Sequence, residues 1–239
     1  TVKPASSSIA ARYLEDEART NRRCIGTVWP TGTLAPMPAP LPPPDGCAVV
    51  TMELQRGVVG DLASMPALVD AAEQRSTLAG CGRLVAGART AGVPVVHARV
   101  HWAADRRGTP LNTPLTAALA RRPEQMLEGT PAVDLVPELG DTGGDLESLR
   151  RHGLTPFTDT DLDAILRSLG VHTVVAVGVS LTVGVLGLCL GASDRGYRVI
   201  VPTDAVVGVP VEYGDAVVAN SVAMVATLTT VDELLATWA

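Results

Sequence analysis

The sequence is poor in aromatic residues and in long apolar segments. It has one Phe, three Tyr and three Trp among 239 residues, although hydrophobic residues make up 46% of the chain. A core must therefore be built from Val, Leu and Ala, in a chain long enough for one large domain. No uninterrupted apolar run reaches the ~20 residues that span a bilayer, so we expect no membrane segment.

Two further shortages restrict the class of protein. The four cysteines, at positions 24, 47, 81 and 189, form no Cys-x-x-Cys pair and no zinc-binding spacing. We therefore expect reduced, mostly buried thiols in a cytoplasmic protein. A net charge of -6 indicates no broad basic surface, so we expect no nucleic-acid partner.

Proline, by contrast, is concentrated near the N-terminus, with seven residues between positions 30 and 44. Proline fixes φ and removes a hydrogen-bond donor, which predicts an extended arm rather than a packed element. We therefore divide the chain into an N-terminal extension, residues 1–46, and a domain, residues 47–239. The arm either lies on the surface of its own chain or wraps a partner subunit.

From residue 47 onward, short Val-rich runs alternate with longer amphipathic stretches. They predict strands at 47–54, 94–100, 173–178, 197–201 and 225–229, and helices at 66–91, 113–120, 159–169, 183–195 and 211–223. This alternation predicts a three-layer α/β/α, Rossmann-like domain with a mostly parallel sheet of about six strands. Ligands bind beyond the carboxyl ends of such strands, which directs attention to Glu53 and to residues 99–101, 150–152 and 179–184.

Four segments near these positions resemble motifs of the isochorismatase-like hydrolase superfamily, in the same order. They are residues 48–55, 151–162, 178–184 and 196–205, within a resemblance that runs from about Cys47 to Trp238. The resemblance implies a hydrolase without a cofactor, a homodimer or larger homo-oligomer, and a cis peptide bond near Val179-Ser180. Amidase members of the superfamily use an Asp, a Lys and a nucleophilic Cys.

This chain differs from those amidases at all three positions, where it has Glu53, Arg151 and Gly184. Gly184 cannot attack a substrate. The isochorismatases proper are similar to this chain there, and they protonate a vinyl ether without a covalent intermediate. Burial at the end of an apolar strand favours the protonated form of Glu53, which suits a general acid. Arg151 could hold a carboxylate or enolate, but it cannot exchange a proton. Alternatively, Glu53 and Arg151 form a purely structural ion pair.

Further candidates for substrate binding lie in the turn and on the second strand. The backbone of Ser180, Leu181 and Thr182 could donate hydrogen bonds to substrate. Arg99 and His101 would share a strand face with His97, where a cation between two imidazoles suits an anion better than a metal ion. We therefore expect a small anionic substrate and no metal.

Two hypotheses follow for the function of the chain. The first is a cofactor-free hydrolase or lyase that acts on a small anionic metabolite by general-acid catalysis, without a thioester intermediate. The second is a catalytically inactive relative that binds a metabolite or a partner.

Overall fold

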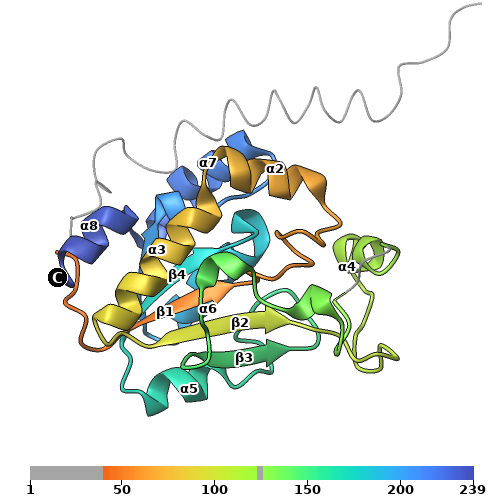
Figure 1. Ribbon diagram of the computed structural model, residues 1–239, viewed down its shortest axis with the longest axis horizontal. Coiled ribbons are helices and arrows are strands. Elements are labelled where there is room, and N and C mark those ends of the chain that lie inside the picture. The colour runs from red at the N-terminus through yellow and green to blue at the C-terminus, as the bar shows by residue number, and fades with distance from the viewer. Residues whose placement is uncertain (1–39, 123–125) are drawn as a thin grey trace, which may run out of the picture. The chain divides into compact units, whose positions relative to one another are not determined.

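The computed structural model describes residues 40–122 and 126–239, and in them six parallel strands form one sheet (Figure 1). The strands are β1 (Cys47–Met52), β2 (Val95–Val100), β3 (Leu146–Arg150), β4 (Thr173–Gly178), β5 (Arg198–Pro202) and β6 (Thr227–Thr229). Their order is β3-β2-β1-β4-β5-β6. The direction of winding therefore reverses between β1 and β4, and a crevice at the carboxyl ends of two such strands is the usual ligand site of this architecture.

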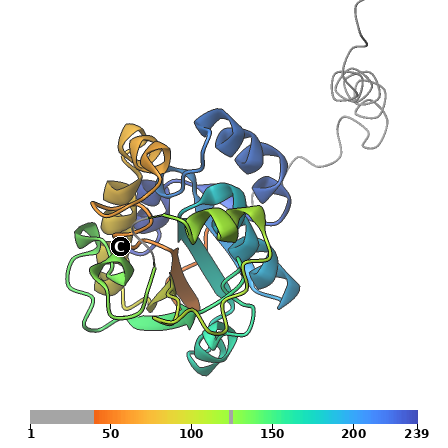
Figure 2. The ribbon, with the colours of Figure 1, turned by 90° about the vertical axis from the view of Figure 1, so that its right-hand side faces the viewer.

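Helices cover both faces of the sheet, which confirms the predicted three-layer architecture (Figure 2). One face packs against α2 (Pro66–Gln74), α3 (Thr77–Thr90) and α8 (Val231–Ala236). The other packs against α5 (Leu162–Ser168), α6 (Leu186–Asp194) and α7 (Val211–Asn220). The short helix α4 (Pro114–Leu119) begins at Thr113, whose side chain accepts a hydrogen bond from Thr116 N–H.

The central strands are built from small branched residues. Every residue of β1 and β4 is buried, because each strand has a neighbour on both sides and helices above and below it. This explains their continuous Val-rich sequences, since neither face meets water. Val, Leu and Ala dominate the two core clusters, as the shortage of aromatic residues predicted.

The predicted helix at 66–91 is wrong, because the chain forms two helices there. Ser76, between α2 and α3, has a left-handed backbone with φ of +52°. The apolar periodicity continues through this break because both helices pack against the same core cluster. Strand β3 was not among the predicted ranges either. It is an edge strand in which buried and exposed residues alternate, so its sequence lacks a continuous apolar run.

The last part of the predicted arm lies against the C-terminal segment. The carbonyl oxygen of Pro42 accepts hydrogen bonds from Thr237 Oγ1 and Trp238 Nε1, both at 3.3 Å. Arg198 Nη2 donates to the carbonyl oxygen of Pro40 at 2.8 Å. Residues 1–39 lie outside the described residues, so the role of the arm stays a prediction. In the described part of the chain, no helix is long and apolar enough to cross a membrane.

Candidate active site

A cavity of about 300 Å³ lies at the carboxyl ends of the central strands. Its lining includes Glu53 after β1, Trp102 after β2, Arg150 at the end of β3, and Ser180 and Gly184 in the turn after β4. Helix α4 contributes Leu115 and Leu119. The cavity therefore lies where the strand order predicts a ligand site, and it contains two of the three residues predicted as catalytic.

Glu53 is held at this position by its backbone and by its neighbour Gln55. The Glu53 N–H donates to the carbonyl oxygen of Ala98 at 3.0 Å, and its φ of +51° turns the chain away from β1. The fully buried Gln55 amide donates to the carbonyl oxygens of Val100 and Val133, and its Oε1 accepts from Val100 N–H. These bonds fix the end of β1 against β2, so the Glu53 carboxyl faces the cavity with 17% of its side chain exposed.

Arg150, and not Arg151, is the cation beside Glu53. Arg150 Nη2 donates to Glu53 Oε1, and only 5% of the Arg150 side chain is exposed. The Arg151 side chain is 56% exposed and pairs with Glu128 at 3.3 Å. Consecutive residues of a strand point to opposite faces of the sheet. A shift of one residue in matching this segment to the family motif therefore selects the exposed Arg151 instead of the buried Arg150. Arg150 therefore occupies the place beside Glu53 that was expected of Arg151.

The Arg150 guanidinium has further hydrogen-bonding capacity. Its Nε and Nη1 are buried and have no hydrogen-bond partner. Buried donors without partners carry a substantial free-energy cost in a folded protein. Neither nitrogen has accessible surface, so a ligand in the cavity does not reach them as the side chains stand.

The turn after β4 contains the predicted cis peptide bond, between Val179 and Ser180. A π-helical segment, Leu181–Val185, follows it and leads into α6. Ser180 and Thr182 line the cavity, and their hydroxyl oxygens lie 3.3 Å apart. Leu181 is buried and is not among the cavity-lining residues, and its N–H donates to the carbonyl oxygen of Val207 at 2.8 Å. The turn thus brings two of its three predicted binding residues to the cavity.

Gly184 lines the cavity but is closely packed on one side. A Cβ atom at this position would lie 2.9 Å from Met52 Cε and 3.2 Å from the carbonyl oxygen of Val179. Met52 therefore occupies part of the space that a side chain at position 184 would need.

The three thiols within residues 40–239 do not supply a nucleophile to the cavity. Burial raises the pKa of both Cys81 and Cys189 to about 12, so neither forms a thiolate near neutral pH. Burial also raises the pKa of Cys47, which lies at the opposite, amino end of β1.

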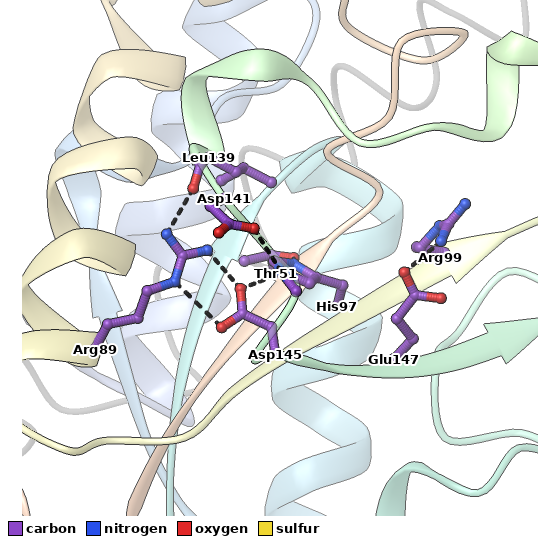
Figure 3. Close-up of polar contacts among 9 residues, drawn as sticks. Thr51, Arg89, His97, Arg99, Leu139, Asp141, Asp145 and Glu147 are labelled. Atoms are coloured by element: carbon purple, nitrogen blue, oxygen red, sulfur yellow. Dashed lines mark hydrogen bonds and ion pairs between the residues drawn. The ribbon is translucent and has the colours of Figure 1, made fainter.

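The two basic residues predicted on β2 do not line the cavity. Arg99 Nη1 pairs with Glu147, as Figure 3 shows, and its Nη2 donates to the carbonyl oxygen of Val133 at 2.7 Å. His101 is buried, and burial lowers its pKa. Neither side chain lines the cavity, so the structure does not place the expected anion-binding residues of β2 at this site.

A chain of buried polar contacts occupies the α3 side of the sheet instead (Figure 3). Thr51 Oγ1 lies 2.8 Å from His97 Nδ1, and His97 Nε2 lies 2.9 Å from Asp145 Oδ2. Arg89 pairs with Asp145 at 2.5 Å and donates to the Leu139 carbonyl oxygen at 2.7 Å. Burial lowers the pKa of His97. Burial opposes ionisation of Asp145, but hydrogen bonds from Arg89 and His97 outweigh it and lower the pKa of this carboxyl.

This chain of contacts looks like a nucleophile, a base and an orienting acid, but its position excludes that role. Thr51 and His97 are 1% and 0% exposed, and neither lines the cavity. The network therefore joins β1, β2 and α3 to the segment before β3 as a structural element. In residues 40–122 and 126–239, no three His, Cys, Asp or Glu side chains are arranged to hold a metal ion.

Comparison with known proteins assigns the family. The isochorismatase domain model matches residues 47–233, most of the chain, so this protein belongs to the isochorismatase family of hydrolases. An uncharacterized isochorismatase family protein, YecD of Escherichia coli O157:H7, is 29% identical over 191 residues, covering 79% of this chain and 94% of that protein.

Two further proteins are similar to this chain, one in sequence and one in fold. Ureidoacrylate amidohydrolase RutB of Pantoea ananatis is 34% identical over 110 residues, which cover 41% of this chain and 44% of that protein. A cysteine hydrolase from Pseudomonas syringae has the same fold, with a TM-score of 0.69 at 20% identity, covering 85% of this chain and 97% of that one.

Sequence reasoning included Arg150 only within residues 150–152, where it chose Arg151, and it missed the apolar part of the cavity. The segment between β2 and β3 supplies Trp102, Leu115, Leu119 and Met126 to the lining. In the sequence these residues appear only as scattered apolar residues in a segment with no predicted strand. That pattern does not show that they line a cavity.

Proposed function

We propose that this protein is a cofactor-free hydrolase in which Glu53 transfers protons and Arg150 holds a substrate oxygen, without a covalent enzyme intermediate. One observation carries the proposal: the Glu53 and Arg150 side chains are paired with each other, and both residues line the cavity. The amidohydrolase among the relatives supports hydrolysis as the reaction class.

We expect no covalent intermediate at this site. The resemblance implies that Gly184 lies at the family's nucleophile position, and burial raises the pKa of the Cys81 and Cys189 thiols. His152 also lines the cavity, but its Nε2 lies 3.6 Å from Asp159 Oδ2, and the hydroxyls of Ser180 and Thr182 are hydrogen-bonded to each other. Water is therefore the attacking group, and it requires a residue that accepts a proton.

Glu53 suits this step because its carboxyl lies beside Arg150 in the lining of the cavity. The carboxylate takes a proton as water attacks, and the resulting carboxylic acid returns that proton to the leaving group. General-acid catalysis is thus retained, with the proton supplied by the attacking water. Arg150 stabilises the negative charge that develops on the substrate oxygen.

The test compares four forms of the protein on a panel of amides, esters and vinyl ethers, with products quantified by mass spectrometry. Glu53→Gln should lower turnover by roughly 10²–10⁴-fold, and Arg150→Met by roughly 10²–10³-fold. Arg151→Met is the matched control, and we expect turnover within about twofold of wild type because this side chain is exposed.

Turnover by Glu53→Gln at the wild-type rate would overturn the proposal. Intact mass spectrometry during turnover adds a second check. We expect no acyl adduct on the protein, and an adduct would indicate a covalent route.

The second candidate function is a protein that binds a metabolite without turning it over. The Glu53–Arg150 pair favours this alternative, since each side chain neutralises the other at a buried position. Ligand-dependent thermal stabilisation without turnover of any panel compound would establish it.

A further inference from the structure

His152 is an ionisable side chain of the cavity lining that the proposed reaction does not use. Two hydrogen bonds hold the chain just before it, where β3 ends. The His101 N–H donates to the carbonyl oxygen of Arg150 at 3.0 Å. Thr109 Oγ1 donates to the carbonyl oxygen of Arg151 at 2.9 Å. The His152 side chain, 33% exposed, therefore has a fixed place in the cavity wall.

The other two charges in the lining cancel. Among the described residues around the cavity, Glu53, Arg150 and His152 are the only ionisable side chains, and the first two pair with each other. Most of the remaining lining is apolar, with Trp102 and Leu115 as examples. A net charge among such side chains is unfavourable. Since an imidazole changes its charge near neutral pH, His152 is the described lining residue that can balance a charged ligand.

Two charged groups lie near His152 outside the lining, and neither occupies its imidazole. His152 Nε2 lies 3.6 Å from Asp159 Oδ2, which is too long for a hydrogen bond, and the Asp159 side chain is 76% exposed. Arg151, the preceding residue, is exposed and pairs with Glu128. Solvent screens charges of this kind. The imidazole therefore keeps its hydrogen-bonding capacity for a ligand.

A monocarboxylate with an apolar chain matches these groups. A protonated imidazole donates a charge-assisted hydrogen bond to one carboxylate oxygen. The hydroxyl oxygens of Ser180 and Thr182 lie 3.3 Å apart, so they share one hydrogen bond and leave one hydroxyl proton for the second oxygen. One proton on an imidazole balances one negative charge, which favours a monoanion over a dianion.

We propose that a small monocarboxylate with an apolar chain binds in this cavity together with one proton, which His152 takes up from solvent. The imidazolium and the carboxylate then leave the lining without net charge. A neutral ligand of the same shape binds without the proton. This coupling goes beyond the proposed hydrolysis, because it holds whether or not the bound molecule is turned over.

Isothermal titration calorimetry measures the coupling directly. Hexanoate and its neutral isostere 2-heptanone are titrated at about pH 7.5 in HEPES and in Tris, whose ionisation enthalpies differ, so the difference in binding enthalpy gives the number of protons taken up. We expect about half to one proton per hexanoate and none for 2-heptanone. From about pH 7.5 to 8.5 the affinity for hexanoate should fall by up to about tenfold, because the proton must come from solvent, and that for 2-heptanone should stay constant.

Two matched variants locate the proton. His152→Gln keeps a hydrogen-bonding side chain that cannot take up a proton. It should abolish proton uptake and weaken hexanoate binding by about tenfold or more, with the affinity for 2-heptanone within about twofold of wild type. His172→Gln is the control, since His172 is exposed, precedes β4 and does not line the cavity, and it should leave both ligands unaffected. Circular dichroism confirms that each variant is folded, and His152→Asn replaces His152→Gln should that variant unfold.

Proton uptake that survives in His152→Gln but disappears in Glu53→Gln would place the proton on Glu53 and overturn the role of His152. Hexanoate binding without proton uptake would overturn the coupling. So would an absence of hexanoate binding at about pH 6, where an imidazole is largely charged. None of these results depends on turnover. Failure of the proposed hydrolysis would appear instead as an absence of products, with proton-coupled binding of hexanoate intact.

Discussion

At the residue scale, the identity of the site depends on two neighbouring arginines and one glycine. Arg150 is the last residue of β3 and faces the cavity, whereas Arg151 lies one position further and faces solvent. The sequence offers no means of choosing between them, because both are arginines in a segment without apolar alternation. Only the register of β3 against β2, in which Val100 is paired with Arg150, makes the choice.

Gly184 and Met52 provide a residue-scale prediction. Gly184→Ala places a Cβ 2.9 Å from Met52 Cε, so the end of the Met52 side chain must move. We expect Gly184→Ala to lower the free energy of unfolding by about 1 kcal/mol through overpacking. In a Met52→Ala background the same substitution should be neutral or stabilising. Urea unfolding of the two single variants and the double variant measures this coupling, and strictly additive effects would contradict the contact.

At the element scale, β3 and the segment before it are held by buried charge rather than by apolar packing. Asp145 receives hydrogen bonds from Arg89 of α3 and from His97 of β2, and only 5% of its side chain is exposed. An edge strand with polar alternation needs such contacts, because it buries little apolar surface of its own.

Asp145→Asn should therefore destabilise the protein. The substitution leaves Arg89 without its counter-ion and His97 with a weaker partner, and we expect the free energy of unfolding to fall by about 2–4 kcal/mol. Asp141→Asn is the matched control. Asp141 is exposed, and its contact with the Gly143 N–H is one that an amide oxygen can also make. Urea denaturation measures both variants, and equal stability would show that the buried network contributes little.

At the scale of the whole molecule, the described part of the arm joins the first strand to the C-terminal segment. Pro42 is buried, and its carbonyl oxygen is the acceptor for the buried indole N–H of Trp238. Leu41 packs against the core cluster on the α3 side of the sheet. The structural domain thus begins before residue 47, where the family match begins.

Two truncations test this boundary. Removal of residues 1–39 should leave the free energy of unfolding of the domain unchanged, because every contact described for Pro40 to Asp45 is kept. Removal of residues 1–45 should lower it by about 2–4 kcal/mol, since Trp238 loses its acceptor and Leu41 its burial. Thermal and urea unfolding compare the two forms. Indistinguishable stabilities would place the boundary at residue 47 after all.

Gel filtration of the same truncations tests the predicted homo-oligomer. If the arm wraps a partner subunit, removal of residues 1–39 shifts elution toward the monomer. An unchanged elution volume would remove the arm from the interface.

The spacing of apolar residues and the positions of glycine and proline by themselves determined the layered architecture and five of the six strands. They also determined the turn that contains Ser180 and Gly184. These features depend on local apolar spacing, which can be read directly from a sequence. Tertiary structure alone decided the partner of Glu53, the exclusion of Arg99 and His101 from the cavity, and its apolar lining. Each of these depends on strand register or on contacts between distant segments, and a shift of one residue reverses the direction of a side chain without changing the pattern.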